Sequence, residues 1–126
     1  MSQEIVSISL PAKVDYARSV RMMAASLSVV CGMNVDEVED IRMAAEEGFV
    51  YACSTTADAC DVEFCVESGT MQIKFKAEGQ LVPEDEMSLQ LSKLLLDAVC
   101  DSVDIASCDA STCIHLVKST EGVYGN

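Results

Sequence analysis

Hydrophobic and polar residues alternate in several segments of the chain, as they do in half-buried β-strands. The first segment is residues 5–10, which Pro11 ends. Residues 61–66 and 71–77 flank Ser68-Gly69, and this arrangement predicts an antiparallel hairpin with a tight turn. The side chains expected to face inward from the hairpin are Val62, Phe64, Met71, Ile73 and Phe75.

Three other segments carry apolar residues at helical spacing. The first covers residues 13–31, and Gly32 supplies a C-terminal stop. The second begins at the N-cap Asn34, with Glu37 three residues later as in a capping box. The third is expected to open at Pro83 and the acidic residues after it. The apolar face predicted for this third helix comprises Met87, Leu91, Leu94, Leu95 and Ala98.

Residues 103–106 and 112–117 alternate again and predict a closing hairpin. The predicted order is therefore β-α-α-β-β-α-β-β. Such segregated helices and hairpins are typical of an α+β fold, a two-layer sandwich in which a mostly antiparallel sheet has helices on one face. We expect a single domain over residues 1–118 and a loose C-terminal tail at 119–126.

The second predicted helix has a carboxylate on the side opposite its core stripe. At about 100° per residue the core stripe comprises Val38, Ile41, Ala45, Phe49 and Ala52. Glu47 lies roughly opposite, next to Met43, Ala44, Val50 and Tyr51, which would not normally all be left to water. This predicts a second face that is buried or lines a cleft. In the alternative interpretation a partner element covers part of the face and Glu47 lies at its edge.

The charge of the chain limits the choice of partners. Eight basic against twenty-one acidic residues give a net charge of −13. Such a charge repels a phosphate backbone, so it argues against nucleic-acid binding and favours a basic protein partner. No apolar segment is long enough to span a bilayer, and the first residues lack the basic and apolar regions of a signal peptide. We therefore expect a cytoplasmic protein with no membrane contact.

The seven cysteines are odd in number and scattered, which favours free thiols in a reducing compartment. Cys60 and Cys65, like Cys108 and Cys113, are too far apart in sequence for a zinc knuckle, so no metal site is expected there. His115 is the only histidine, and its place in an alternating strand favours a structural or exposed ring over a catalytic one.

Three segments carry a resemblance to a known family: GMNVDEVEDIRMAAEEGFVYA at 32–52, LLLDAVCDSVDI at 94–105 and TCIHLVKS at 112–119. In this order they resemble the anti-sigma-factor serine kinases of the RsbW type, in the GHKL (histidine-kinase-like, Bergerat-fold) ATPase superfamily. The resemblance covers nearly the whole chain. It implies the Bergerat fold, ATP and Mg²⁺ as cofactors, a sigma factor and an anti-sigma factor antagonist as protein partners, and a homodimer.

The resemblance also implies the site residues. The family's second helix carries a glutamate that acts as general base and, four residues later, an asparagine that helps to hold Mg²⁺. Glu47 matches the glutamate, but Tyr51 stands in the place of the asparagine. The family's Asp-x-Gly, whose carboxylate accepts from the adenine amino group, corresponds to Ala77-Glu78-Gly79. The glycine is kept, whereas Ala77 offers no acceptor.

The family's phosphate lid normally contains glycines, and the matching segment between Pro83 and Leu96 contains none. Lys93 is the lone cation in this segment. It is a candidate phosphate contact; the alternative is a solvated lysine on a helix surface.

Two hypotheses of different classes follow, and the sequence leaves open whether the protein is an enzyme. In the first, the chain is an anti-sigma regulatory factor-like protein that controls a sigma factor by partner switching and has a degenerate nucleotide site. In the second, it is an active ATP-dependent serine protein kinase that phosphorylates the antagonist. An unrelated acidic α+β adaptor is a third possibility. Calorimetry with Mg-ATP separates the first two.

Overall fold

The computed structural model describes residues 3–81, 86–108 and 110–120. Its elements are β1 (Glu4–Pro11), the short 3-10 helix η1 (Val14–Tyr16), α1 (Ala17–Val30), α2 (Val35–Cys53), β2 (Ala59–Glu67), β3 (Thr70–Ala77), α3 (Glu86–Val99), β4 (Ser102–Cys108) and β5 (Ser111–Ser119). This confirms the predicted order of strands and helices. The predicted opening of the third helix at Pro83 lies outside the described residues. Within the described ranges no helix combines the length and the apolar sequence needed to cross a bilayer.

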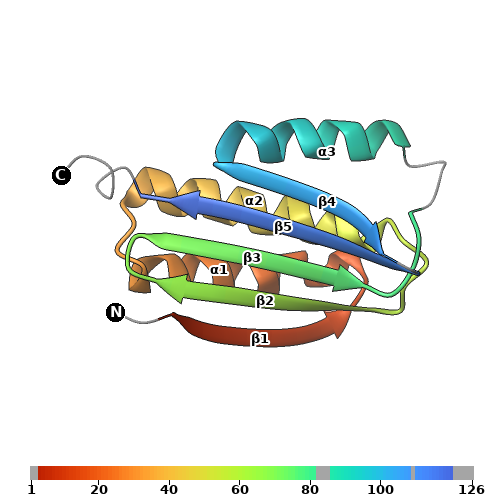
Figure 1. Ribbon diagram of the computed structural model, residues 1–126, viewed down its shortest axis with the longest axis horizontal. Helices are drawn as coiled ribbons and strands as arrows, with labels where there is room; N and C mark the ends of the chain where they lie inside the picture. The colour runs from red at the N-terminus through yellow and green to blue at the C-terminus, as the bar shows by residue number, and fades with distance from the viewer. Residues whose placement is uncertain (1–2, 82–85, 109, 121–126) are drawn as a thin grey trace.

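The strands form one antiparallel sheet in the order β1-β2-β3-β5-β4 (Figure 1). The last strand, β5, lies between β3 and β4 and pairs with both. Helices α1 and α2 lie against one face of the sheet, and α3 packs on α2 beside β4. The predicted α+β sandwich is therefore confirmed.

The hairpin of β2 and β3 has the turn that the sequence predicts. Glu67 pairs with Thr70 across Ser68-Gly69, and Gly69 has a φ of 81°, which residues with a side chain rarely adopt. All five side chains predicted to face inward are buried: Val62, Phe64, Met71, Ile73 and Phe75.

Two backbone signals set the junction between α1 and α2. Gly32 has a φ of 83°, and the N–H of Met33 donates to the carbonyl of Ser28 at 3.2 Å, as in a Schellman motif. The capping box then starts α2. The N–H of Glu37 donates to Asn34 Oδ1 at 2.9 Å, while the N–H of Asn34 donates to Glu37 Oε1 at 2.8 Å. Both signals were readable in the sequence.

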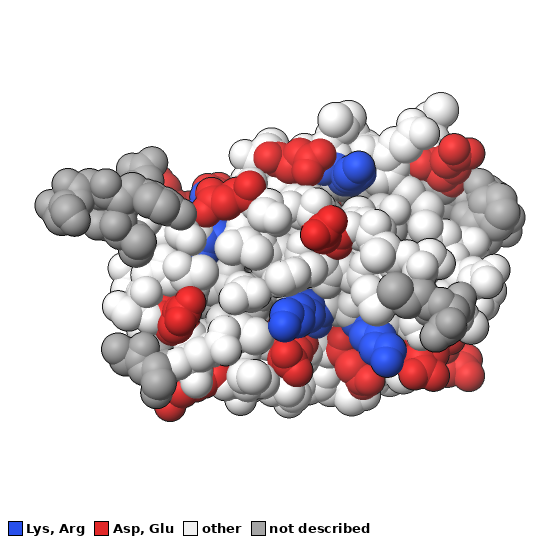
Figure 2. Space-filling model, viewed as in Figure 1, with Lys and Arg blue, Asp and Glu red and all other residues white. Residues whose placement is uncertain are grey.

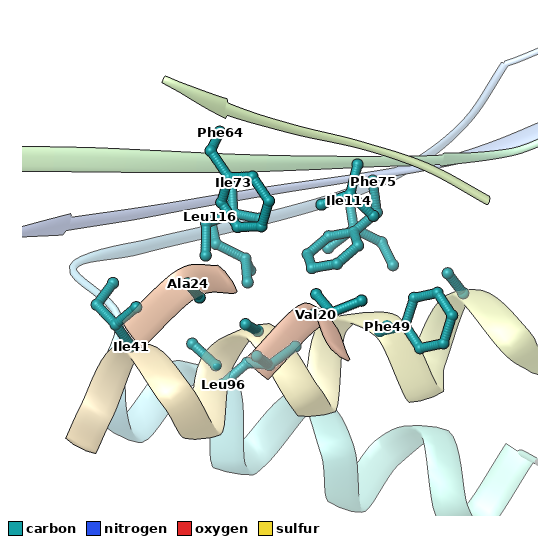
Figure 3. Close-up of a cluster of buried hydrophobic side chains, with 14 of the residues drawn as sticks. Val20, Ala24, Ile41, Phe49, Phe64, Ile73, Phe75, Leu96, Ile114 and Leu116 are labelled. Carbon is teal, nitrogen blue, oxygen red and sulfur yellow. The ribbon is translucent and has the colours of Figure 1, made fainter. Parts of the chain in front are cut away.

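The core lies between the sheet and the two helices that cover it (Figure 3). Figure 3 shows Phe75 and Ile114 pointing from the strands toward the helices. Gly48 on α2 makes room for the aromatic ring, because a Cβ added there would lie 2.5 Å from Phe75 Cε1. The absence of a side chain at residue 48 therefore lets α2 approach the sheet closely.

The apolar face predicted for α3 is wrong. The helix buries Leu89, Ser92 and Leu96 instead. The predicted face is exposed: Met87, Leu91, Leu94, Leu95 and Ala98. The helix has apolar residues on two sides, and the neighbouring helix α2 decides which side is buried; the spacing of the residues alone contains no such information.

The predicted boundary between domain and tail also needs correction. Ser119 belongs to β5, and its N–H donates to Asp101 Oδ2 at 2.8 Å. The next residue, Thr120, donates its N–H to the carbonyl of Gly69 at 2.8 Å and its hydroxyl to Glu37 Oε1 at 2.8 Å. The folded unit thus continues through residue 120, and residues 121–126 lie outside the described ranges.

Candidate functional site

Glu47 lies on the side of α2 that faces α3. The hydroxyl of Ser92 on α3 donates to Glu47 Oε2 at 3.0 Å, and Ser92 is buried while Glu47 is partly buried. Among the neighbours of Glu47, Ala44 and Tyr51 are buried, whereas Met43 is 44% exposed. The second face of α2 is therefore only partly buried, and Glu47 lies at its edge. A partner helix covers part of this face, as in the alternative interpretation.

Tyr51 lies one turn after Glu47 on α2 and is buried. Burial raises the pKa of its phenol, so the group stays neutral at physiological pH. A neutral phenol is bulkier than the expected carboxamide and a poorer ligand for Mg²⁺, which prefers compact oxygen donors at short distances. Glu47 and Tyr51 therefore do not reproduce the metal-holding pair of the family.

Ala77 is the last residue of β3 and is fully buried. Its methyl group cannot accept a hydrogen bond from adenine. The next residue, Glu78, is exposed, and its carboxylate lies 4.0 Å from Lys76 Nζ. The strand alternation predicts this outward direction, and it leaves Glu78 unable to replace the missing acceptor.

Gly79 brings two loops into close contact. A Cβ at this position would lie 2.7 Å from Thr56 Oγ1 and closer still to the backbone nitrogen of Ala57. The carbonyl of Gly79 accepts a hydrogen bond from Thr112 Oγ1 at 2.9 Å. Packing between the loop after α2 and the segment after β3 therefore requires this glycine, whether or not a nucleotide binds.

Lys93 follows Ser92 on α3, but its side chain is exposed. Adjacent helix residues point about 100° apart, so Lys93 does not share the direction of the Ser92–Glu47 contact. Among the residues that the structure describes, Lys93 forms no ion pair. The solvated-surface interpretation of Lys93 agrees with this geometry.

The segment that matches the family's phosphate lid is a helix from Glu86 onward. Backbone amides inside a helix bond to carbonyls of the same helix, so they cannot wrap a triphosphate. Two polar side chains of this region, Ser92 and Thr112, were not predicted as site residues from the sequence. The available signal for Ser92 was its place three residues after Leu89 and four before Leu96, on the side of the helix opposite the predicted stripe.

These residues do not fit Mg-ATP. Glu47, at the general-base position, accepts a hydrogen bond from Ser92 on a helix of the same chain. The buried phenol of Tyr51 replaces the amide, and the buried methyl group of Ala77 replaces the adenine acceptor. A groove of about 610 Å³ does exist on the outer face of the sheet, away from the helices. Figure 2 shows this face, with basic side chains near its middle. The groove is lined by other residues, including Glu63, Lys74, Lys76, Asp104 and His115.

The cysteines whose side chains the structure describes are free thiols: Cys31, Cys53, Cys60, Cys65, Cys100 and Cys113. Cys60 and Cys65 are five residues apart on β2, so they face opposite sides of the sheet and cannot share a metal ion. Within the described ranges no three His, Cys, Asp or Glu side chains are arranged to hold a metal.

Burial of the thiols predicts a loss of stability at alkaline pH. Desolvation raises the pKa of Cys53 to about 11 and those of Cys60 and Cys100 to about 12. The unfolded chain loses these protons first, near pH 9, so the stabilising contribution is complete below pH 9 and is lost as pH rises toward 12. Urea unfolding at a series of pH values will measure this loss. Cys60→Ala should show a shallower decline, and an identical decline in both proteins would contradict the assignment.

Comparison with known proteins places the fold. No protein-family model and no curated protein sequence matches the chain. Its structure is similar to the crystal structure of the RsbU and RsbW domains of Rv1364c from Mycobacterium tuberculosis, with a TM-score of 0.69 and 17% sequence identity. The predicted fold is confirmed. The match covers 92% of this chain but 32% of that chain, so this chain spans about a third of the structure that it matches.

The contact between Ser92 and Glu47 should matter for stability. Ser92→Ala removes the only donor recorded for this partly buried carboxylate among the described residues, so we expect a loss of about 1 to 2 kcal/mol in the free energy of unfolding. Urea unfolding will measure it. Ser88→Ala is a matched control, because Ser88 is exposed on the same helix and should change stability by less than about 0.5 kcal/mol. Equal effects of the two substitutions would contradict a structural role for the contact.

Proposed function

We propose that this chain is an anti-sigma regulatory factor-like protein that controls a sigma factor by partner switching, with a nucleotide site that has become degenerate. The observation that carries the proposal is the fold, which is similar to a structure containing an RsbW domain over 92% of this chain. The three segments that resemble the RsbW-type family lie on α2, on α3 with β4, and on β5, in the expected order.

The degenerate site is supported by the contacts of α2 with its neighbours. A general base must reach its substrate within hydrogen-bond distance, and here Glu47 meets Ser92 instead. Neither Tyr51 nor Ala77 supplies the group that its position requires for magnesium or adenine. ATP and Mg²⁺ are therefore not part of the proposed activity, which consists of protein binding alone.

The charge of the chain supports a protein partner. A net charge of −13 favours electrostatic steering toward a basic, DNA-binding protein such as a sigma factor. The second proposed partner is an anti-sigma factor antagonist, which competes with the sigma factor for the chain. A homodimer is proposed by analogy with the family.

Co-purification will test the proposal. The tagged full chain is expressed with each sigma factor and each antagonist domain of the source genome, and complexes are isolated with and without ATP. We expect one sigma factor and one antagonist to bind and to exclude each other, with no change on adding ATP. Failure of every sigma factor and antagonist to bind would overturn the proposal, and binding that requires ATP would restore the kinase alternative.

A further inference from the structure

The outer side of α3 is an exposed apolar stripe, formed by Met87, Leu91, Leu94 and Leu95 and ending at Ala98 (the α3 stripe). Met87 is 84% exposed, Leu91 60% and Leu94 66%. The opposite side of the helix is already occupied by its contact with α2, through Leu89, Ser92 and Leu96. Single apolar residues are common on protein surfaces, but a contiguous exposed apolar patch often marks a site where another molecule binds.

The spacing of the α3 stripe indicates the shape of its partner. Met87, Leu91, Leu94 and Ala98 are separated by four, three and four residues, which is the a/d pattern of a helix that packs along another helix. At 1.5 Å per residue the stripe is about 16 Å long, or roughly three turns. A helix of similar length would cover the stripe along its full extent.

The charges around the stripe indicate the chemistry of that helix. Three exposed carboxylates belong to α3 or to the turn after it: Glu86, Asp97 and Asp101. Lys93 is the one basic residue in the same stretch, residues 86–101. Figure 2 shows carboxylates along this edge of the molecule with a basic group among them. A second copy of the chain would bring another net charge of −13 to this edge, and an anionic membrane would also be repelled.

We propose that the α3 stripe is the docking surface for a basic amphipathic α-helix of a partner protein. This inference rests on the proposed function, for which it supplies the contact surface and the chemical character of the partner segment. Apolar residues of the partner helix pack between Leu91 and Leu94, and its lysines or arginines lie near the carboxylates of Glu86 and Asp97, which are exposed on the same helix.

The test uses a fluorescent synthetic helix of leucine and lysine in heptad pattern as the probe, with anisotropy measured at physiological salt. We expect saturable 1:1 binding to the full chain. Leu91→Gln with Leu94→Gln keeps good helix formers and should weaken binding by about tenfold or more. Val29→Gln with Val30→Gln is the matched control, because these valines are exposed on α1 and should leave binding unchanged. Circular dichroism of both variants confirms that they are folded.

Two further probes separate docking from plain charge attraction. A scrambled peptide of the same composition and a leucine-glutamate helix should each bind about tenfold more weakly or not at all. Equal binding of the scrambled peptide, or unchanged binding by the Leu91→Gln and Leu94→Gln variant, would overturn the proposal. Self-association that this variant abolishes would also overturn it, since a second copy would then cover the stripe.

The same variant separates this inference from the proposed function. If a sigma factor binds the wild-type chain and the Leu91→Gln and Leu94→Gln variant equally well, the docking surface is wrong and the proposed function stands. If the synthetic helix binds at the stripe while no sigma factor or antagonist binds, the surface stands and the proposed function is wrong.

Discussion

Titration of the wild-type chain with Mg-ATP will give no saturable heat at physiological ATP concentrations. Two polar contacts to the nucleotide are missing, because Tyr51 replaces the metal-holding amide and Ala77 replaces the adenine acceptor. Each lost hydrogen bond to a buried polar group costs about 1 to 3 kcal/mol, so the two losses lower affinity on the order of a hundredfold or more. Isothermal calorimetry will measure the binding, and a radiolabel assay will find no phosphotransfer to the antagonist.

The double variant Tyr51→Asn with Ala77→Asp tests whether nucleotide binding can be restored. It restores one amide and one carboxylate at the two deficient positions, so some nucleotide affinity should return. Tyr51→Leu with wild-type Ala77 is the control, because it removes the phenol without supplying a ligand. Tight Mg-ATP binding by the unmodified chain, together with loss of phosphotransfer in Glu47→Gln, would restore the enzyme hypothesis.

Gly48→Ala will destabilise the protein by about 1 to 3 kcal/mol, because the new methyl group would lie 2.5 Å from the Phe75 ring. Helix propensity alone would predict the opposite effect, because alanine is more favourable than glycine by about 1 kcal/mol in the interior of an exposed helix. Phe75 is buried, so its ring can move only by disturbing the rest of the core. Thermal and urea unfolding will measure the loss.

A double-mutant cycle tests the cause of that loss. Phe75→Leu shortens the side chain opposite residue 48, so Gly48→Ala should cost less in the Phe75→Leu background than in the wild type. Strict additivity of the two substitutions would show that the clash with the ring is not the cause. An increase in stability on Gly48→Ala alone would show that α2 does not lie as close to β3 as described.

The sequence was sufficient for those parts of the fold that local chemistry determines. Gly32 and Gly69 adopt the positive φ values that their positions indicated, and Asn34 with Glu37 forms the capping box. The inward residues of the β2–β3 hairpin follow from alternation, because a strand has only two faces and one of them meets the helices. Each of these features depends on residues close together in the chain.

The face of α3 could not be obtained in the same way. Leu89 and Leu96 lie on one side of the helix, and the residues of the α3 stripe lie on another. Counting apolar residues favours the wider stripe, but the structure buries the narrower side, where Ser92 meets Glu47. Which side of α3 is buried depends on its contact with α2, where Ser92 and Glu47 meet although they are 45 positions apart in the chain. The sequence around either residue does not indicate that contact.

The sequence showed which nucleotide-binding groups the candidate site lacks, but not which residues its side chains contact. The side chains at positions 51 and 77 are fixed by the sequence, so the missing amide and the missing acceptor could be read directly. The partner of Glu47 could not, because a serine among leucines has many possible neighbours. Gly79 matched a nucleotide motif, yet its contact with Thr56 is a sufficient reason for a glycine there.

The position of β5 in the sheet has a consequence for synthesis of the protein on the ribosome. β5 pairs with both β3 and β4, yet it begins at Ser111, 34 positions after the last residue of β3, Ala77. At translation rates of about 5 to 20 residues per second, the nascent chain carries β3 with one unpaired edge for a few seconds. Exposed strand edges invite pairing with other chains. A chaperone that holds the nascent chain until β5 emerges would prevent such pairing.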